Sequence, residues 1–396
     1  MAQASRRRSS GRLASLGQDH ARGHKSYVEN LTPGGRLWLR TKPFFAPPPD
    51  ELMLCLRTFA HIVEQLSLGL RAQVLDVGCG PGWMSEFFAR CGYWVTGIDI
   101  SEDMVEIARS RIKSIEGPIG EGTEKPMAEF YAMPVRDMPW HDRFDAAVLY
   151  DTMHHFDDEL ATLQVIRRAL VPGGRIYIRE GARPAPGSEG EQQLIREMEE
   201  YGTLESPFNP EYLAQVVRDA GFVDVRRFVE IDELLDIGDT RGLLARLRRY
   251  VAYRLGRNEP ESNTLIATKP IPIDQGAESF SAELQADVGW RASDNGQTLS
   301  LLLRVRNTGR SFWPAGGTAK GVVTLGPYVP HPGGERLELP RTLLPHALAP
   351  GEELEIELCV PRVSVGDSRE VAVDCVREGI AWFADMGSAP LVAAVE

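Results

Sequence analysis

Two adjacent histidines, His154 and His155, stand in the segment LYDTMHHFDD, shortly after Tyr150. An imidazole titrates near neutral pH and can take the proton of a hydroxyl group, so both are candidate general bases. The alternative is that the pair only packs or orients the loop. Tyr150 is a further catalytic candidate, because the electron-rich face of its ring attracts cations and can shape a pocket for one.

A second stretch with chemical meaning is VLDVGCGPGW, in which an apolar run ends in Asp76 and is followed by Gly78, Gly80 and Gly82. A strand, a glycine turn and a helix together form a nucleotide pocket in α/β proteins. A dinucleotide fingerprint needs its third glycine where this chain has Trp83, and Asp76 would repel a pyrophosphate. The stretch therefore disfavours a nicotinamide oxidoreductase and favours a ligand with a cationic amine or sulfonium, such as S-adenosylmethionine.

Asp99 ends the next apolar run, in the segment GIDIS, 21 residues after Gly78. A carboxylate at the end of this second strand accepts hydrogen bonds from ribose hydroxyls in dinucleotide folds. Asp99 is therefore predicted to hold the ribose of the ligand. The alternative is that Asp99 merely caps the following helix, although Ser101 is itself a good cap.

The elements that position these residues follow from the hydrophobic pattern. Short apolar runs alternate with amphipathic segments, which predicts a parallel sheet with helices on both faces. Strands are expected at 72–78, 94–100, 128–133, 144–151 and 174–180, with two closing strands at 223–232 and 263–270. Helices are expected at 50–68, 82–92, 101–112, 159–171 and 210–222, and residues 13–50 are expected to be irregular because of their prolines.

Beyond residue 275 the pattern changes to short alternating segments separated by turn signals such as NTG, PAGG and HPGG. This pattern favours a second, all-β domain, a sandwich that resembles immunoglobulin-like modules. The predicted organisation is a disordered basic tail (1–25), a lid and helix (26–71), the α/β domain (72–270, with a helical insertion at about 232–257) and the sandwich (276–396). Trp313 and Trp382 of the sandwich are either core residues or platforms for a sugar.

The motifs VLDVGCGPGW, GIDIS, FDAAVLYDTMHHF and LVPGGRIYIRE together resemble class I S-adenosylmethionine-dependent methyltransferases of the small-molecule branch. The resemblance covers residues 72–270 and implies a Rossmann-like seven-stranded sheet whose last strand is antiparallel. It implies S-adenosylmethionine as the cofactor, with the glycines at its methionine end. The cofactor-binding set that it implies is Asp76, Gly78, Cys79, Gly80, Gly82, Trp83, Asp99, Ile100, Ala132, Met133 and Tyr150.

One departure from the family pattern concerns the adenine ring. Many relatives carry an Asp–Ala pair whose carboxylate binds the adenine amine, whereas this chain has Ala132 and Met133 at that strand end. The amide of Met133 is expected to meet the adenine instead, and its side chain to pack on the ring. Asp137 is the alternative source of the lost carboxylate.

The acceptor candidates are Lys42, Glu180 and Glu205, which the resemblance places around the mouth of the cleft. Lys42 contacts either the cofactor carboxylate or an anionic acceptor, or it is a surface lysine between packed aromatic residues. In the segment RGLLARLRRYVAYRLG the leucines are expected to pack on the sheet and the arginines to be solvated. A membrane surface or a lipid-linked acceptor is the alternative partner of that helix.

Charge and composition exclude several classes of protein. The net charge of −12 argues against general nucleic-acid binding. No apolar run reaches the ~20 residues that span a bilayer, and five cysteines without a CxxC motif indicate a reducing compartment and no metal site. A cytoplasmic protein is therefore expected, and its oligomeric state stays open.

These features predict transfer of a methyl group to a hydroxyl of a sugar, a glycan or a related metabolite. The methyl transfer depends on the pocket, whereas the sugar depends mainly on the appended sandwich. The nearest alternative is the same chemistry on a non-sugar natural product or a lipid. The other alternative is a binding protein, either a cofactor-binding pseudoenzyme or a glycan-binding adaptor.

Overall fold

The computed structural model describes residues 32–44, 49–115, 127–156, 158–181, 210–228, 262–273 and 279–395, except 294–295, 318 and 332, and a few isolated positions elsewhere. The predicted basic tail, Glu205 and most of the predicted insertion lie outside the described residues. The chain divides into two compact units. The first comprises residues up to Gln65, Gln73–Leu170 and Arg175–Lys269, and the second comprises Leu66–Ala72, Val171–Gly174 and the chain from Pro270 onward.

The first unit is built on a seven-stranded sheet with the strand order β3-β2-β1-β4-β5-β7-β6. Strands β1 to β5 run parallel, and β7 lies antiparallel between β5 and β6. This topology confirms the predicted Rossmann-like sheet with its antiparallel strand. The strands are β1 (Gln73–Val77), β2 (Trp94–Asp99), β3 (Met127–Ala132), β4 (Phe144–Tyr150), β5 (Leu170–Gly181), β6 (Val223–Phe228) and β7 (Ser262–Thr268).

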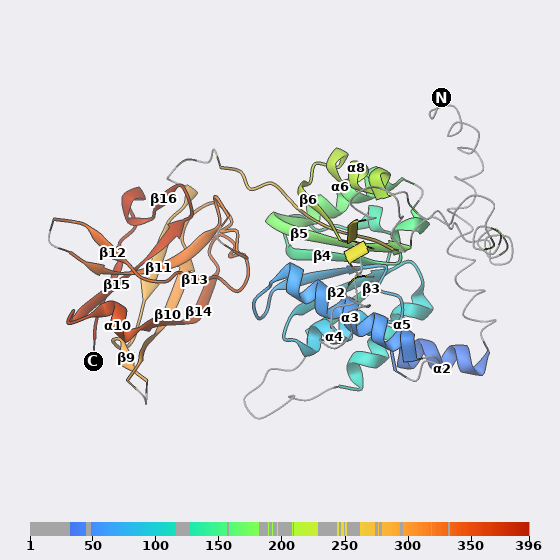
Figure 1. Cartoon of the computed structure of the whole chain (residues 1–396), viewed down its shortest axis with the longest axis horizontal. Coiled ribbons are helices and arrows are strands. Elements are labelled where there is room, and N and C mark those ends of the chain that lie inside the picture. Colours follow the sequence, from blue (N-terminus) through green and yellow to red (C-terminus); the bar gives the residue numbers. More distant parts are fainter. Residues whose placement is uncertain are drawn as a thin grey trace. The chain divides into compact units, whose positions relative to one another are not determined.

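Helices cover both faces of this sheet (Figure 1). Ile176 and Ile178 of β5 belong to the core that the sheet forms with α6 and α8. Because side chains alternate along a strand, Tyr177 points to the other face, where its hydroxyl lies 2.7 Å from Nδ1 of His61 on α3. The helices are α3 (Pro49–Leu66), α4 (Trp83–Arg90), α5 (Glu102–Lys113), α6 (Glu159–Ala169) and α8 (Pro210–Asp219).

Helix α2 (Pro33–Thr41) contradicts the expectation that residues 13–50 are irregular. Pro33 lies in the first turn, where the missing N–H would have no helical partner, and the Thr32 hydroxyl caps the helix by accepting from the Gly35 amide at 3.1 Å. Helix α3 likewise begins at a proline, Pro49. Prolines in this region start helices, so they do not prevent them.

The described residues of the segment RGLLARLRRYVAYRLG do not pack their apolar side chains on the sheet as expected. Leu244, Leu247 and Val251 are helical, but they are 54%, 56% and 44% exposed. For these residues the packing prediction is wrong. No helix in the described ranges is long and apolar enough to cross a bilayer.

The second unit consists of two antiparallel sheets that share one hydrophobic core, as the predicted all-β architecture requires. One sheet has the order β14-β10-β8, with β9 on β10, and the other has the order β12-β11-β15-β16, with β13 on β11 and β17 on β15. The strands are β8 (Ala282–Gln285), β9 (Arg291–Ala292), β10 (Thr298–Asn307), β11 (Val323–Pro330), β12 (Arg336–Glu338), β13 (Thr342–Leu343), β14 (Glu353–Pro361), β15 (Glu370–Arg377), β16 (Ala381–Trp382) and β17 (Leu391–Ala394).

The two tryptophans considered as sugar platforms serve the domain itself. Trp313 is fully buried and packs edge-on against Phe383, with ring centroids 5.1 Å apart. The ring of Trp382 carries the guanidinium groups of Arg336 and Arg341, at 4.8 and 4.6 Å from its centroid. Trp313 is therefore a core residue, and Trp382 is engaged by its own neighbours.

Candidate functional site

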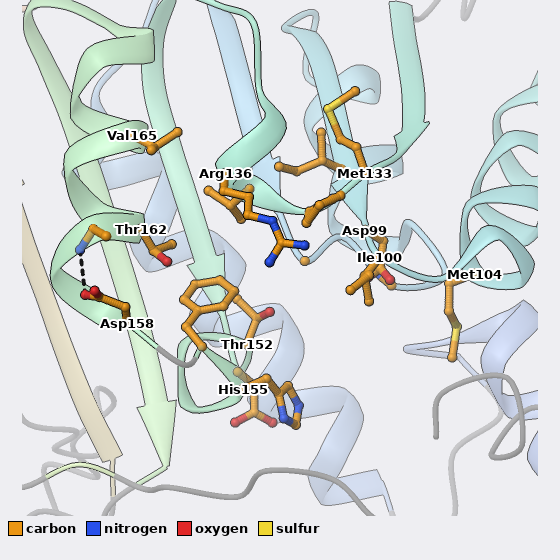
Figure 2. A pocket seen from close by; sticks show the side chains of 18 residues that line it. Asp99, Ile100, Met104, Met133, Arg136, Thr152, His155, Asp158, Thr162 and Val165 are labelled. Carbon is orange, nitrogen blue, oxygen red and sulfur yellow. Dashed lines mark hydrogen bonds between the residues drawn. The ribbon is translucent and has the colours of Figure 1, made fainter. Parts of the chain in front are cut away.

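A cavity of about 390 Å³ opens at the carboxyl ends of β1, β2, β3 and β4. Open α/β sheets bind their ligands at this edge. Figure 2 shows side chains converging on the cavity from the loops after these strands and from α6. The lining residues that the sequence had singled out are Gly78, Gly80, Asp99, Ile100, Met133 and His155.

The glycine turn after β1 needs glycine at two positions. Gly78 has a φ of +69°, and a Cβ there would collide with the hydroxyl of Thr152. Gly82 has a φ of +75°, and its Cβ would lie 2.6 Å from the Cβ of Ala108. Because side chains strain such conformations, only glycine allows helix α5 and the loop after β4 to approach the turn.

Asp99 lies on the wall of the cavity with both oxygens oriented. Its Oδ2 accepts a hydrogen bond from the Gly80 amide at 2.9 Å, and its Oδ1 accepts one from the Ser101 amide at 2.8 Å. The cap of α5 is Ser101, whose hydroxyl accepts from Met104. A carboxylate held in this way can still accept from ribose hydroxyls, so the predicted ribose role remains a prediction.

Asp76 lies under the glycine turn and is only 3% exposed. Its Oδ2 accepts a hydrogen bond from the hydroxyl of Ser85 at 2.6 Å. Burial raises the pKa of Asp76 to about 6; the Ser85 bond opposes this shift and the charge of Asp99 adds to it. Asp76 is absent from the cavity lining within the described chain, so its charge would act on a ligand through the turn.

The base end of the cavity differs from the prediction. The Met133 amide donates to the carbonyl of Asp99 at 2.8 Å, so it is already used and does not offer itself to an adenine. Ala132 and Asp137 are not among the described lining residues, and the Asp137 side chain is 62% exposed. The wall continues instead with residues 134–136.

The histidine pair is connected to a buried carboxylate. Nδ1 of His154 lies 2.7 Å from Oε2 of Glu180, which is 0% exposed at the end of β5. The other oxygen, Oε1, accepts the amides of Thr152 and Met153 at 2.9 and 2.7 Å. The rings of His154 and His155 are in contact, tilted by 54° with centroids 3.9 Å apart, and of the two it is His155 that is among the described residues lining the cavity. One buried carboxylate thus orients both the loop and the first histidine.

Tyr150 and Trp83 form a second aromatic group, with ring centroids 5.5 Å apart. The Lys42 ammonium lies 5.9 Å from the Trp83 centroid, and the Arg179 guanidinium lies 5.1 Å from that of Tyr150. Burial raises the pKa of the Tyr150 hydroxyl well above its usual range, although Arg179 opposes the shift. Tyr150 is therefore neutral at physiological pH, and Lys42 lies between aromatic rings with its ammonium near the glycine turn.

Arg111 is a residue whose role sequence reasoning missed. Its side chain is 7% exposed and donates to the carbonyls of Arg40 and Lys42 at the end of α2, at 2.5 and 2.6 Å. Glu86 pairs with the same guanidinium at 2.9 Å. A cation on the last carbonyls of a helix stabilises its end, so Arg111 docks the segment that carries Lys42.

Three potential ligand atoms for a cation also lie together, although no metal site was predicted. One atom each of Asp151, His154 and Glu180 falls within a span of 4.8 Å. Both oxygens of Glu180 already accept hydrogen bonds from the loop and from His154. The arrangement therefore fits an oriented imidazole more directly than a metal centre.

Comparison with known proteins identifies the family. A family model of a methyltransferase domain matches residues 52–227. The O-methyltransferase rstn1 of Aspergillus nomiae is 30% identical over 191 residues, which cover 48% of this chain and 78% of that protein. This chain belongs to the class I S-adenosylmethionine-dependent methyltransferases.

Other relatives match this methyltransferase over shorter shares. The ubiquinone biosynthesis O-methyltransferase of Aeromonas salmonicida is 28% identical over 193 residues, covering 47% of this chain and 71% of that protein. Its counterpart from Xanthomonas campestris is 33% identical over 109 residues, so the match spans 27% of this chain and less than half, 42%, of that relative.

Among solved structures, phosphoethanolamine N-methyltransferase 2 of Haemonchus contortus matches with 17% identity and a TM-score of 0.42, over 59% of this chain and 55% of that one. At this identity and TM-score the likeness adds nothing to the assignment.

S-adenosylmethionine is the cofactor of this methyltransferase, and the cavity fits it. The glycine turn allows close approach to its backbone, and Asp99 offers carboxylate oxygens on the wall of the cavity. Two carboxylates, Asp76 and Asp99, give the site the negative charge that suits a sulfonium and an ammonium. The described residues that line the cavity do not include four members of the expected cofactor-binding set, Cys79, Gly82, Trp83 and Tyr150.

Proposed function

We propose that this methyltransferase transfers a methyl group to a hydroxyl of a small-molecule acceptor, with His154 as the general base and Glu180 as its positioning residue. The observation that carries the proposal is the 2.7 Å contact between Nδ1 of His154 and the fully buried carboxylate of Glu180. The names of the relatives agree with an oxygen acceptor, since those of Aspergillus nomiae and Aeromonas salmonicida are O-methyltransferases.

The carboxylate decides which nitrogen of His154 carries the proton. An ionised carboxylate only accepts hydrogen bonds, so Nδ1 must donate and Nε2 is left as the acceptor. An Nε2 lone pair can then take the proton of an attacking hydroxyl, which makes the oxygen a better nucleophile. Glu180 also stabilises the imidazolium that results, because its negative charge lies next to the new positive charge.

When bound, the cofactor supplies the methyl group, which is activated by its sulfonium because the leaving group is then a neutral thioether. The protein supplies alignment. Asp99 orients the ribose, the glycine turn seats the amino-acid tail, and the loop anchored by Glu180 sets the distance between base and acceptor. Holding the reactants in attack geometry contributes about 7–11 kcal/mol in favourable cases, more than the base does.

The test compares three variants. His154→Ala should lower kcat by ~10²–10⁴-fold, the usual contribution of a general base, and should remove the acidic limb of the pH–rate profile. Glu180→Gln should keep the loop, because the amide oxygen still accepts from Thr152 and Met153. Its NH₂ would now donate to Nδ1, which favours the tautomer that cannot act as a base. The exposed His141 provides the matched control, His141→Gln.

S-adenosylhomocysteine affinity must stay within about twofold in all three variants, because none of these residues is assigned to the cofactor. Full activity of His154→Ala would reduce the mechanism to alignment alone. Absence of turnover in the unaltered protein on every acceptor fraction would favour the pseudoenzyme instead.

The acceptor itself is proposed as a hydroxylated metabolite without commitment to a sugar. The sugar prediction depended mainly on the appended sandwich, and the burial of Trp313 and the arginines on Trp382 remove the aromatic platforms that would have supported it. Incubation with methyl-labelled cofactor and a cell extract split into glycan, lipid and small-molecule fractions tests the class. We expect the label in the small-molecule fraction. Label confined to the glycan fraction would instead support a sugar acceptor.

A further inference from the structure

An arginine lines the cavity a few residues after the strand end at which the family pattern would place an acid. Arg136 is the middle residue of the short helix η2 (Val135–Asp137), directly after β3. In Figure 2 its guanidinium projects into the cavity, which Asp99, Ile100, Thr152 and His155 also line. The side chain is 79% exposed, so it reaches the cavity from its rim.

The guanidinium is held only loosely by its neighbour. Its recorded ion pair, from Nε to Oδ1 of Asp137, is 3.9 Å long and joins two exposed side chains. Such a surface pair contributes little to stability, so little is lost when the arginine turns toward a ligand. Asp137 is not among the described residues that line the cavity, and its side chain is 62% exposed.

The other groups near the end of β3 that could bind the cofactor base are already hydrogen-bonded or have no suitable polar atom. The Met133 amide is bonded to the Asp99 carbonyl, Pro134 has no N–H, and Ala132 has no polar side chain. Among the side chains of residues 132–136, the Arg136 guanidinium is the one hydrogen-bonding group, and it is a donor. The amide of Val135, which begins η2 and so lacks a partner within that turn, is a second donor. No carboxylate reaches the base from residues 132–136.

We propose that Arg136 reads the edge of the cofactor base with hydrogen-bond donors, in place of the acceptor used by relatives that carry an acid. A purine offers ring nitrogens such as N7 as acceptors, and arginine pairs well with an N7 and a 6-oxo group together. Adenine presents an amino donor at position 6, whereas hypoxanthine presents an oxygen there. This pocket therefore favours the 6-oxo base relative to adenine more than an acid-bearing pocket would.

This inference rests on the cofactor assignment and not on the proposed acceptor or base. The experiment measures the dissociation constants of S-adenosylhomocysteine and S-inosylhomocysteine by isothermal titration calorimetry. Three proteins are compared: the unaltered chain, Arg136→Met, which keeps the length of the side chain but removes its donors, and Asp137→Asn as the matched neighbour. Both positions are exposed, so each variant should keep its melting temperature within a few degrees.

Arg136→Met should weaken S-inosylhomocysteine binding more than S-adenosylhomocysteine binding. The ratio of the two dissociation constants should shift roughly five- to tenfold toward adenine, the lower end of what a base-edge contact contributes. Asp137→Asn should leave both constants within about twofold.

If the ratio of the two dissociation constants is unchanged in Arg136→Met, the proposal is refuted. This includes the case in which both ligands bind more weakly by the same factor, which would mean that the arginine only stacks on the base. A loss of adenine affinity in Asp137→Asn would return base recognition to the carboxylate. If the unaltered protein bound neither ligand, the cofactor assignment would fall together with the proposal. As long as the unaltered protein binds S-adenosylhomocysteine, the comparison tests the role of Arg136 and not the cofactor assignment.

Discussion

The buried charge of Asp76 gives a prediction whose size follows from the structure. The carboxyl is 3% exposed, and its pKa is raised from 3.8 to about 6, mainly by burial. A group whose pKa is higher in the folded state than in the unfolded chain stabilises the fold most at low pH, and that contribution is lost as the pH rises through the folded value. Above pH 6 the folded protein must hold a charged group in a poorly solvated place.

The cost can be estimated. A rise from 3.8 to about 6 corresponds to about 3 kcal/mol, at 1.36 kcal/mol per pKa unit. Asp76→Asn removes the charge but keeps an oxygen that can accept from Ser85. At pH 8 we therefore expect Asp76→Asn to raise the free energy of unfolding of the first unit by up to about 3 kcal/mol. At pH 3.5 the gain should vanish, because both residues are then neutral.

Urea denaturation of the free protein at a series of pH values measures this gain. Saturating S-adenosylmethionine should shrink the gain at pH 8, because the sulfonium and ammonium groups of the ligand stabilise the ionised carboxylate, so the ligand binds the parent more tightly. Asp374→Asn is the matched control. Asp374 is another buried carboxyl with its pKa raised to about 6, but it lies in the second unit, so its replacement should leave cofactor affinity unchanged.

The reasoning about Asp76 fails if Asp76→Asn gains nothing at pH 8. It fails equally if the gain is the same at pH 3.5 and pH 8, since the effect would then be packing and not charge. A gain that saturating cofactor leaves untouched would separate the charge of Asp76 from ligand binding.

Three further predictions follow from the site. Asp99→Ala should weaken S-adenosylhomocysteine binding by at least about 100-fold without unfolding the protein, because two hydrogen bonds from ribose hydroxyls to a charged group are lost. Calorimetry measures the affinity and a melting curve checks the fold. An affinity like that of the parent would refute the ribose role. Dialysis against EDTA should leave turnover unchanged, because both oxygens of Glu180 are already engaged by hydrogen bonds, whereas a loss restored by Mg²⁺ would assign the Asp151, His154 and Glu180 group to a metal. Arg111→Met should raise KM for the cofactor roughly tenfold with kcat nearly constant, since charged hydrogen bonds to the end of α2 are lost. Arg111→Lys should restore part of the affinity. If kcat fell equally in both variants, the effect would be general damage to the protein.

The parts of this molecule that the sequence could predict are those encoded locally. Apolar runs of four to six residues gave the strands, because a strand buried on both faces needs nothing but apolar side chains. The glycines of the turn were readable because left-handed backbone and close approach exclude every other residue at Gly78 and Gly82. The place of Asp99 at the cavity was predictable because it is the last residue of a strand, β2.

The parts that could not be predicted depend on partners far away in the chain. Arg111 reaches Arg40 and Lys42, whose separations of 71 and 69 residues leave no periodic signal. The use of the Met133 amide depends on the pairing of two strands and a register that no local motif states. The helix α2 was missed for a different reason, because a proline in the first turn is compatible with a helix and the prediction treated the prolines of residues 13–50 as breakers.

Glu180 joins these two kinds of information. Its position at the end of β5 is readable from the sequence, but its function arises only because β4 and β5 are neighbours in the sheet. From there it accepts the amide of Thr152, whose hydroxyl occupies the space left open by Gly78, and it accepts Nδ1–H of His154. A change at Glu180 would therefore reach the cofactor turn and the proposed base together. Glu180→Gln, which preserves the first contact and reverses the second, is the substitution that separates a structural role of this carboxylate from a catalytic one.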